Sequence, residues 1–273
     1  MSLIEKRAMD DVYPMPIEGR ENPPRKKGLT MVIDMGSDVS ATKGLINFAG
    51  RYIDIFKISS GSAALYSERI IRKKIQILKE NDIEVEAGGS HFEVALWKGK
   101  FKEYIEKLLD LKVDYVEIAD GHLPLESSKR LDLIRLAKDM GIKVITEVGK
   151  KQPKENIKAI GIVEQVNKDL DAGGDLVIIE GKASGKNVGI FDSDGLVIES
   201  ELKEIVNGVS DVNKLMWETP LRGQQQSMIS KFGPNVNLGN IFPDEVYPLE
   251  LLRNGLMLMP LINAYNKEKK LEE

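Results

Sequence analysis

The 273-residue sequence contains no cysteine and only two histidines, His91 and His122. The absence of thiols excludes disulfides, thiolate metal sites and a cysteine nucleophile. Two histidines are also too few for a metal site built on several imidazoles. Any bound metal would therefore be a hard cation held by oxygen atoms, in the manner of Mg²⁺.

The sequence also lacks long apolar runs and a strong excess of either charge. No run reaches the roughly 18 apolar residues that suggest a membrane helix, and the first residues carry no apolar core of a signal peptide. The 39 basic and 43 acidic residues give a formal net charge of −4, whereas nucleic-acid binders usually have a basic excess. We therefore expect a cytoplasmic protein with no nucleic-acid partner and no membrane partner.

Short β-branched apolar runs recur along the chain, each followed by polar or glycine residues and then by a helical period. Such runs are typical of buried parallel strands. The predicted strands are Leu29–Asp34, Ile53–Ile58, Glu84–Ala87, Tyr115–Ala119, Val144–Val148, Leu176–Glu180, Leu215–Glu218 and Val236–Leu238. The predicted helices are Tyr66–Asn81, Phe101–Leu111, Ser128–Met140, Lys154–Ala172, Glu201–Val206, Gln224–Phe232 and Tyr247–Leu256.

This alternation predicts an α/β protein with a parallel sheet. Eight repeats favour a closed (β/α)₈ TIM barrel in a single domain over an open sheet, and no Gly-x-Gly-x-x-Gly motif follows the first strand. We place the barrel at residues 28–258. Residues 1–27 are expected to form an N-terminal arm on the surface, and residues 259–273 a charged C-terminal extension.

Acidic residues lie in or at the ends of most predicted strands. The carboxyl ends of the strands form the reactive face of such a barrel, and carboxylates gathered there repel one another unless a cation shares the space. We predict Asp34, Glu147, Glu180 and Glu218 as Mg²⁺ ligands; Glu86 and Glu117 lie on two further strands. Any one of these could instead be a solvated or salt-bridged strand end, and spacing alone does not decide between them.

Basic and small polar residues at the same ends indicate a small anionic substrate. Lys57 lies inside an apolar run, where a lysine is costly unless it is paired. Lys150 and Lys151 follow Glu147. The loop with Lys182, Ser184 and Gly185 is a candidate anion cradle, because small residues let backbone N–H groups approach a ligand. Asn237, Gly239 and Asn240 follow the eighth predicted strand, where many barrels bind phosphate.

Several segments together resemble the phosphosulfolactate synthase family. They are LTMVID at 29–34, YIDIFK at 52–57, EVGKK at 147–151, IEG at 179–181, SGKNVGI at 184–190 and GPNVNLGNI at 233–241. The resemblance covers about residues 28–256. It implies a (β/α)₈ barrel that adds sulfite to phosphoenolpyruvate with Mg²⁺, giving (2R)-3-phosphosulfolactate for coenzyme M biosynthesis. Lysines would stabilise the enolate-like charge and protonate the product, and Lys57, Lys150 and Lys151 are the candidates.

The sequence departs from the family pattern at residues 58–63, 90–91, 119–122 and 182–183, and both histidines fall at changed positions. One alternative is therefore a different small phosphorylated carboxylate as substrate. A second is a non-catalytic, stress-related homologue. A third is an isomerase or aldolase that uses Lys57 as a Schiff-base lysine. We also expect a homo-oligomer.

We predict that Lys150 is a general acid or enolate stabiliser. Lys150→Met keeps most of the side chain but removes its charge, so kcat should fall by about 10²-fold or more with folding intact. Steady-state kinetics and circular dichroism test this. Retained turnover would transfer the role to Lys57 or Lys151.

Overall fold

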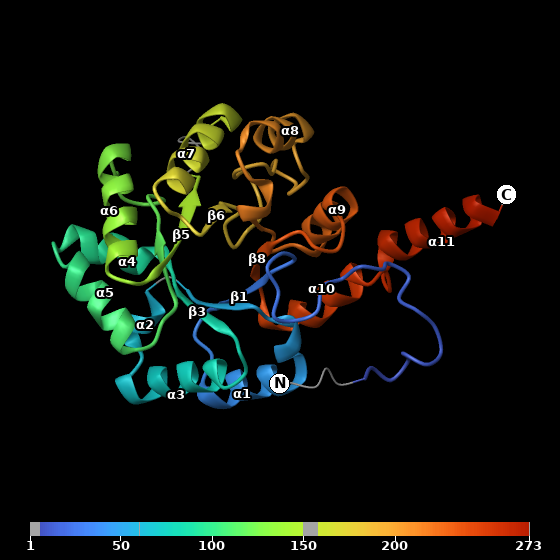
Figure 1. Ribbon diagram of the computed structural model, residues 1–273, viewed down its shortest axis with the longest axis horizontal. Helices are drawn as coiled ribbons and strands as arrows, with labels where there is room; N and C mark the ends of the chain where they lie inside the picture. Colours follow the sequence, from blue (N-terminus) through green and yellow to red (C-terminus); the bar gives the residue numbers. More distant parts are fainter. Residues whose placement is uncertain (1–5, 60, 150–157, 273) are drawn as a thin grey trace.

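The chain folds into a closed barrel of eight parallel strands, ordered β1 to β8 as in the sequence, with helices around it (Figure 1). The structure is a computed structural model and describes residues 6–59, 61–149 and 158–272. The predicted (β/α)₈ TIM barrel is confirmed. No helix in the described part of the chain is both long and apolar enough to cross a bilayer.

The strands are short and buried on both faces, as parallel strands covered by helices must be. They are β1 (Thr30–Asp34), β2 (Ile55–Ile58), β3 (Glu84–Ala87), β4 (Tyr115–Ile118), β5 (Lys143–Val148), β6 (Leu176–Ile179), β7 (Leu215–Glu218) and β8 (Leu238–Ile241). The helices are α1 (Val39–Ala49), α2 (Ser62–Leu65), α3 (Glu68–Lys79), α4 (Gly89–Trp97), α5 (Phe101–Asp110), α6 (Ser127–Asp139), α7 (Ala159–Asp171), α8 (Glu199–Gly208), α9 (Arg222–Phe232), α10 (Val246–Arg253) and α11 (Leu258–Glu272).

Strand β8 is where the predicted boundaries are wrong. The prediction ended the strand at Leu238, whereas β8 begins there and runs to Ile241. Gly239 and Asn240 disfavour strands in isolation, and Asn240 has a positive φ of 53°. Pairing of Leu238 with Trp217 on β7 and with Thr30 on β1 overrides this local preference. The carboxyl end of β8 therefore lies three residues later than predicted.

The helix predictions differ mainly between β2 and β3. The periodic run from Tyr66 to Asn81 predicted one helix, but α3 begins at Glu68 after an extended Ser67, and the short α2 precedes it. Helices α1, α2 and α4 were not assigned boundaries from sequence. The predicted helix start at Lys154 lies outside the described residues.

Two separate apolar clusters fill the molecule. The larger lies between the strands and the helices, and the smaller fills the inside of the barrel with Leu29, Met31, Ile55, Tyr115, Ile145, Leu176, Ile178 and Met216. Alternate residues of a strand share one face. Lys57, Glu147, Glu180 and Glu218 follow inner-face residues by two positions, so their side chains line the next inner layer, toward the carboxyl ends.

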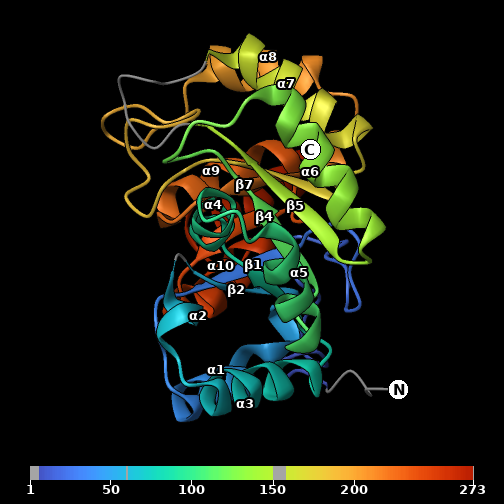
Figure 2. The same cartoon turned by 90° about the vertical axis from the view of Figure 1, so that its left-hand side faces the viewer.

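The N-terminal arm packs against the opposite end of the barrel. Arg20 contacts Glu250 of α10 at 3.1 Å, and Arg25 contacts Asp54, just before β2, at 3.1 Å. These two arginine side chains are only 6% and 2% exposed. The described residues of the arm are exposed or half-buried, and these two arginine side chains anchor it to the base of the barrel. In Figure 1 the arm runs beside α10 and α11, and α11 projects away from the barrel. Figure 2 shows α1 and α3 on the side opposite α7 and α8.

Arg20→Met should lower the free energy of unfolding by about 3 kcal/mol, because it leaves the buried Glu250 carboxylate without its main partner. Burial alone raises the pKa of Glu250, but Arg20 outweighs it and the pKa lies below its ordinary value. This stabilisation is present above the unfolded carboxyl pKa of about 4.3. It is lost as pH falls through the lowered folded-state value. Urea unfolding at pH 7 and pH 3 measures both effects.

Lys27→Met is the matched control for this substitution. The side chain of Lys27 is 51% exposed and its contact to Glu21 lies at the surface. Its loss should change stability by no more than about 0.5 kcal/mol. Equal effects of the two substitutions would contradict an anchoring role for Arg20.

Candidate active site

Five glutamates and one lysine form a ring inside the carboxyl end of the barrel, hereafter the acidic ring. Its members come from five strands and from the first residue after a sixth, and all are at most 5% exposed. They are Lys57, Glu86, Glu117, Glu147, Glu180 and Glu218. Among the described residues the ring therefore carries five carboxylates against one ammonium group.

Lys57 lies among four of these carboxylates. Its Nζ is 2.5 Å from Oε2 of Glu117 and 3.4 Å from Oε1 of Glu218. Glu86 and Glu147 each approach Nζ to 3.8 Å. Burial alone would lower the pKa of Lys57, but the charges of these carboxylates outweigh it, and the pKa is raised well above its ordinary value. Lys57 is therefore a permanently charged ammonium group.

Glu86 is the ring member with a strongly raised pKa. Burial is the largest cause, and the neighbouring Glu117 and Glu218 add to it, whereas Lys57 opposes it. The nearby Glu117 carboxylate disfavours a second negative charge, so the protonated form of Glu86 is favoured, as in close carboxylate pairs. The Lys57 charge and the raised pKa of Glu86 thus both reduce the negative charge of the ring.

Backbone N–H groups beyond the strand ends hold three of the other carboxylates. Gly89 donates to Glu117 at 2.8 Å, Gly181 to Glu218 at 3.0 Å, and Lys182 to Glu180 at 2.6 Å. A Cβ at position 89 would lie 2.4 Å from Oε1 of Glu117. Only glycine allows the first residue of α4 to come this close.

Glu147, Glu180 and Glu218 form a group that fits a metal ion. One carboxylate oxygen of each lies within 4.8 Å of the others, and all three side chains are buried. Buried carboxylate oxygens suit Mg²⁺, and two positive charges would offset part of the negative charge of the ring. The residues present therefore fit the cation predicted from the sequence, and three of the four predicted ligands lie together.

Asp34 does not join this group. It faces outward from β1, where it forms a buried ion pair with Lys74 of α3 and accepts hydrogen bonds from Ser37 at 2.7 and 2.8 Å. Burial raises the pKa of Asp34, but Lys74 and Ser37 outweigh it and lower the pKa. The strand alternation explains the difference: Asp34 lies one residue beyond the inner-face Ile33, on the helix-facing side.

The loop after β6 contains the predicted anion cradle. Ser184 is exposed, and Gly185 is buried with its carbonyl accepting from Gln224 of α9 at 2.6 Å. Lys182 has a positive φ of 56°, and its backbone N–H caps Glu180. The loop is therefore tied both to the acidic ring and to α9, and Ser184 lies on its exposed side.

The structure separates the three residues predicted around β8. Gly239 faces the barrel interior, where an added Cβ would lie 2.7 Å from Met31. Asn240 is 5% exposed and its Oδ1 has no hydrogen-bond partner among the described residues. The prediction for Asn237 is wrong, because this side chain lies at the amino end of the barrel. Its Oδ1 accepts from the Leu29 N–H, and its Nδ2 donates to the carbonyls of Asn213 and Leu215. It lies at the wrong end because β8 begins after it.

Lys150 and Lys151 lie outside the described residues. The sequence did not assign a role to Glu86 or Glu117, although both follow the inner-face alternation that places Lys57. It also missed Lys74 as the partner of Asp34, because nothing in the sequence relates a helix residue to a strand end 40 positions away.

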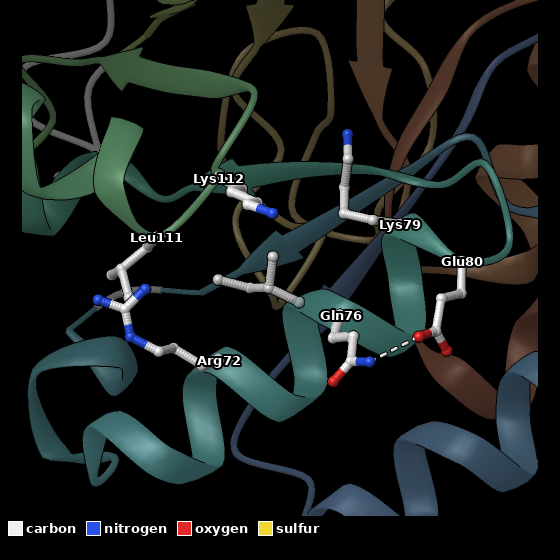
Figure 3. A pocket seen from close by; sticks show the side chains of 7 residues that line it. Arg72, Gln76, Lys79, Glu80, Leu111 and Lys112 are labelled. Atoms are coloured by element: carbon white, nitrogen blue, oxygen red, sulfur yellow. Dashed lines mark hydrogen bonds between the residues drawn. The ribbon is translucent and has the colours of Figure 1, made fainter.

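A hollow of about 450 Å³ lies away from this ring (Figure 3). Its lining is mostly charged or polar and comes from α3 and the turn after α5, including Arg72, Lys79, Glu80 and Lys112. Gln76 donates to Glu80 at 2.7 Å, one turn further along the same helix. These residues lie between helix ends on the outside of the barrel, so the hollow does not open onto the acidic ring.

Comparison with known proteins identifies the family of the chain. The family model described as (2R)-phospho-3-sulfolactate synthase (ComA) matches residues 18–258. The chain belongs to the phosphosulfolactate synthase family. The phosphosulfolactate synthase of Methanocaldococcus jannaschii is 42% identical over 234 residues, covering 85% of this chain and 92% of that protein. The Bacillus subtilis enzyme is 34% identical over 239 residues, covering 87% and 93%.

More distant relatives extend the comparison. Protein HEAT-STRESS-ASSOCIATED 32 of Arabidopsis thaliana is 23% identical, with 86% of this chain and 89% of that protein covered. Among solved structures, 3-hexulose-6-phosphate synthase from Salmonella typhimurium superposes with a TM-score of 0.54 at 14% identity, covering 84% of this chain and all of that one. At this identity the likeness shows the barrel fold alone. The chain is an enzyme of the phosphosulfolactate synthase family and acts on a small substrate.

Asn237→Ala should lower the free energy of unfolding by about 2 kcal/mol, because it leaves the buried Leu29 N–H without a partner. The KM for a phosphorylated substrate should stay within about twofold, because a side chain at the amino end of the barrel does not reach the ring. Thermal unfolding and steady-state kinetics test the two statements. A large rise in KM without loss of stability would return Asn237 to the substrate site.

Proposed function

We propose that this protein is a Mg²⁺-dependent synthase that adds sulfite to phosphoenolpyruvate to give phosphosulfolactate. The observation that carries the proposal is the group of Glu147, Glu180 and Glu218 beside the ammonium of Lys57, in a chain of this family. The product is the one that the names of the relatives give, and the two reactants are those that the resemblance to the family implies.

The reaction builds negative charge on the substrate carboxylate. The sulfur lone pair of sulfite forms a bond to the methylene carbon, and the electrons of the double bond move onto the carboxylate as an enolate-like dianion. A general acid then protonates the neighbouring carbon. Fixed positive charge close to the carboxylate lowers the energy of this dianion.

Lys57 supplies such a charge. Its carboxylate neighbours keep it protonated, and they hold the ammonium group in place before substrate arrives. Glu147, Glu180 and Glu218 would hold Mg²⁺, which when bound supplies further positive charge for the substrate oxygens. Lys150 remains our proposed proton donor, and Lys151, the next residue in the sequence, is a second candidate.

The phosphate of the substrate is assigned to the β6 and β8 ends of the barrel. Asn240 offers a buried amide, Ser184 an exposed hydroxyl, and Lys182 a cationic side chain on the same loop as Ser184. Gly185 and Gly239 shape this region rather than bind through side chains. Asn237 is left out because of its position at the other end.

The Schiff-base alternative is disfavoured by the surroundings of Lys57. Imine formation needs a neutral amine, and enzymes obtain one by lowering the pKa of the lysine. The carboxylates of the ring do the opposite. Borohydride should therefore fail to trap a substrate adduct at Lys57.

The direct test is a reaction of the purified protein with phosphoenolpyruvate and sulfite, followed by ³¹P and ¹³C NMR. We expect phosphoenolpyruvate to disappear only when sulfite is present, activity to be lost with EDTA, and activity to return with Mg²⁺. Sulfite-independent loss, or no loss under any of these conditions, would refute the proposed substrates. The second of these results would favour a different substrate or a non-catalytic role.

Glu180→Gln should lower kcat by about 10²-fold or more and weaken binding of Mn²⁺ used as a spectroscopic stand-in, because it removes one anionic ligand. Glu199→Gln on α8 is the matched control, since Glu199 is 69% exposed and pairs only with Lys231 among the described residues. Unchanged Mn²⁺ binding in Glu180→Gln would remove this residue from the metal site.

A further inference from the structure

The loop that follows β4, the strand of Glu117, carries a histidine that the reaction described above does not use. His122 lies in the loop between β4 and α6, on the carboxyl side of the barrel. Its Nδ1 is 2.7 Å from Oε2 of Glu93, a residue of α4 that is 5% exposed. The other oxygen of Glu93 accepts the backbone N–H groups of His122 and Leu123 at 2.8 and 2.9 Å.

This arrangement fixes the imidazole in one orientation. A carboxylate that accepts three N–H groups leaves Nδ1 as the proton-carrying nitrogen. Nε2 has no hydrogen-bond partner among the described residues, and the side chain is 52% exposed. A carboxylate that orients an imidazole while leaving its second nitrogen open is the arrangement by which proteins present histidine to a ligand.

The pair lies close to the acidic ring. Gly89 at the start of α4 donates to Glu117, and Glu93 is four residues later on the same face of that helix. Four residues of helix advance about 6 Å, so Glu93 and His122 lie about one helical turn from the Glu117 carboxylate. Figure 2 shows α4 beside the end of β4.

We propose that His122, oriented by Glu93, is an oxyanion-binding residue at the barrel mouth: as the imidazolium it keeps Nδ1–H on Glu93 and presents Nε2–H to an anionic reactant. This inference rests on the proposed function for the identity of the reactants. Within the described part of the ring the only cation is Lys57, which glutamates enclose. An oxyanion that enters beside β4 therefore meets His122 as a hydrogen-bond donor outside that enclosure.

The charges around the imidazole come from three elements. Glu93 faces it from α4, and Asp120 in its own loop is paired with Arg130 of α6 at 3.3 Å. Glu126 and Lys129, near the start of α6, line the adjoining hollow of about 650 Å³ together with Glu93. A bound oxyanion adds negative charge to this set and favours the imidazolium form.

The test uses the fact that the chain has only two histidines. Histidine labelled with ¹⁵N and ¹³C gives two ring systems, and His91→Gln identifies them. Sulfite, phosphoenolpyruvate and inorganic phosphate are then added separately in the presence of Mg²⁺, with chloride at matched ionic strength. We expect one or more oxyanions to shift the Nε2 signal of His122 and raise its titration midpoint, while chloride leaves both unchanged. The compound that produces this response is the oxyanion that His122 binds.

Kinetics of the variants separate binding from structure. His122→Asn should raise KM for the responding oxyanion about 10- to 100-fold, the loss expected for one charge-assisted hydrogen bond, with kcat changed much less. Glu93→Gln should give a smaller rise. His91→Gln is the matched control, because glutamine can still accept the N–H of Ala64 that His91 accepts at 3.3 Å.

The outcomes distinguish this inference from the proposed function. No response of His122 to any of the three oxyanions, or an equal response to chloride, would overturn its assignment even if the enzyme turns over. A response of His122 without turnover of phosphoenolpyruvate and sulfite supports the assignment and refutes the proposed substrates. A fall in kcat with unchanged KM in His122→Asn would also overturn an oxyanion-binding role.

Discussion

The close approach of Lys57 to four glutamates is the interaction on which the rest of the site depends. Without this ammonium group, five buried carboxylates would face one another inside the barrel, and most would have to take up protons to remain there. With it, part of this negative charge is offset. Glu147, Glu180 and Glu218, two of which also contact Lys57, remain as an oxygen-rich group suited to a divalent cation. A ring of this kind costs folding free energy, and ligands that neutralise it stabilise the folded chain.

The fold could be predicted from the sequence because each strand is a short apolar run that is buried in the barrel wall. Periodicity failed where neighbours override local preference. Gly239 and Asn240 disfavour a strand by themselves, yet pairing with both β7 and β1 extends β8 over them. The two-residue difference in where β8 starts placed Asn237 at the wrong end of the barrel. Boundaries of this kind are set by tertiary pairing, which a single sequence does not display.

Those site residues could be predicted whose inward or outward direction follows from the alternation of side chains along a strand. Glu147, Glu180 and Glu218 share the inner face, and their convergence follows from barrel closure. Asp34 is also a carboxylate at the carboxyl end of a strand, but its position in the alternation turns it toward Lys74 of α3. Counting from the inner-face Met31 would have shown this. The contact between Glu93 and His122 joins helix α4 to the loop after β4, so no spacing rule could have found it.

The anchoring of the N-terminal arm places contacts that stabilise the fold at one end of the barrel, away from the candidate active site at the other end. Arg20 and Arg25 secure the base of the barrel through Glu250 and Asp54, whereas the acidic ring occupies the opposite end. Groups that share no partners and lie on opposite ends of a barrel contribute independently to its energetics. Stability can therefore be adjusted at the base without altering the electrostatic field in which the substrate sits, which leaves the mouth free to be remodelled for a different reactant on an unchanged support.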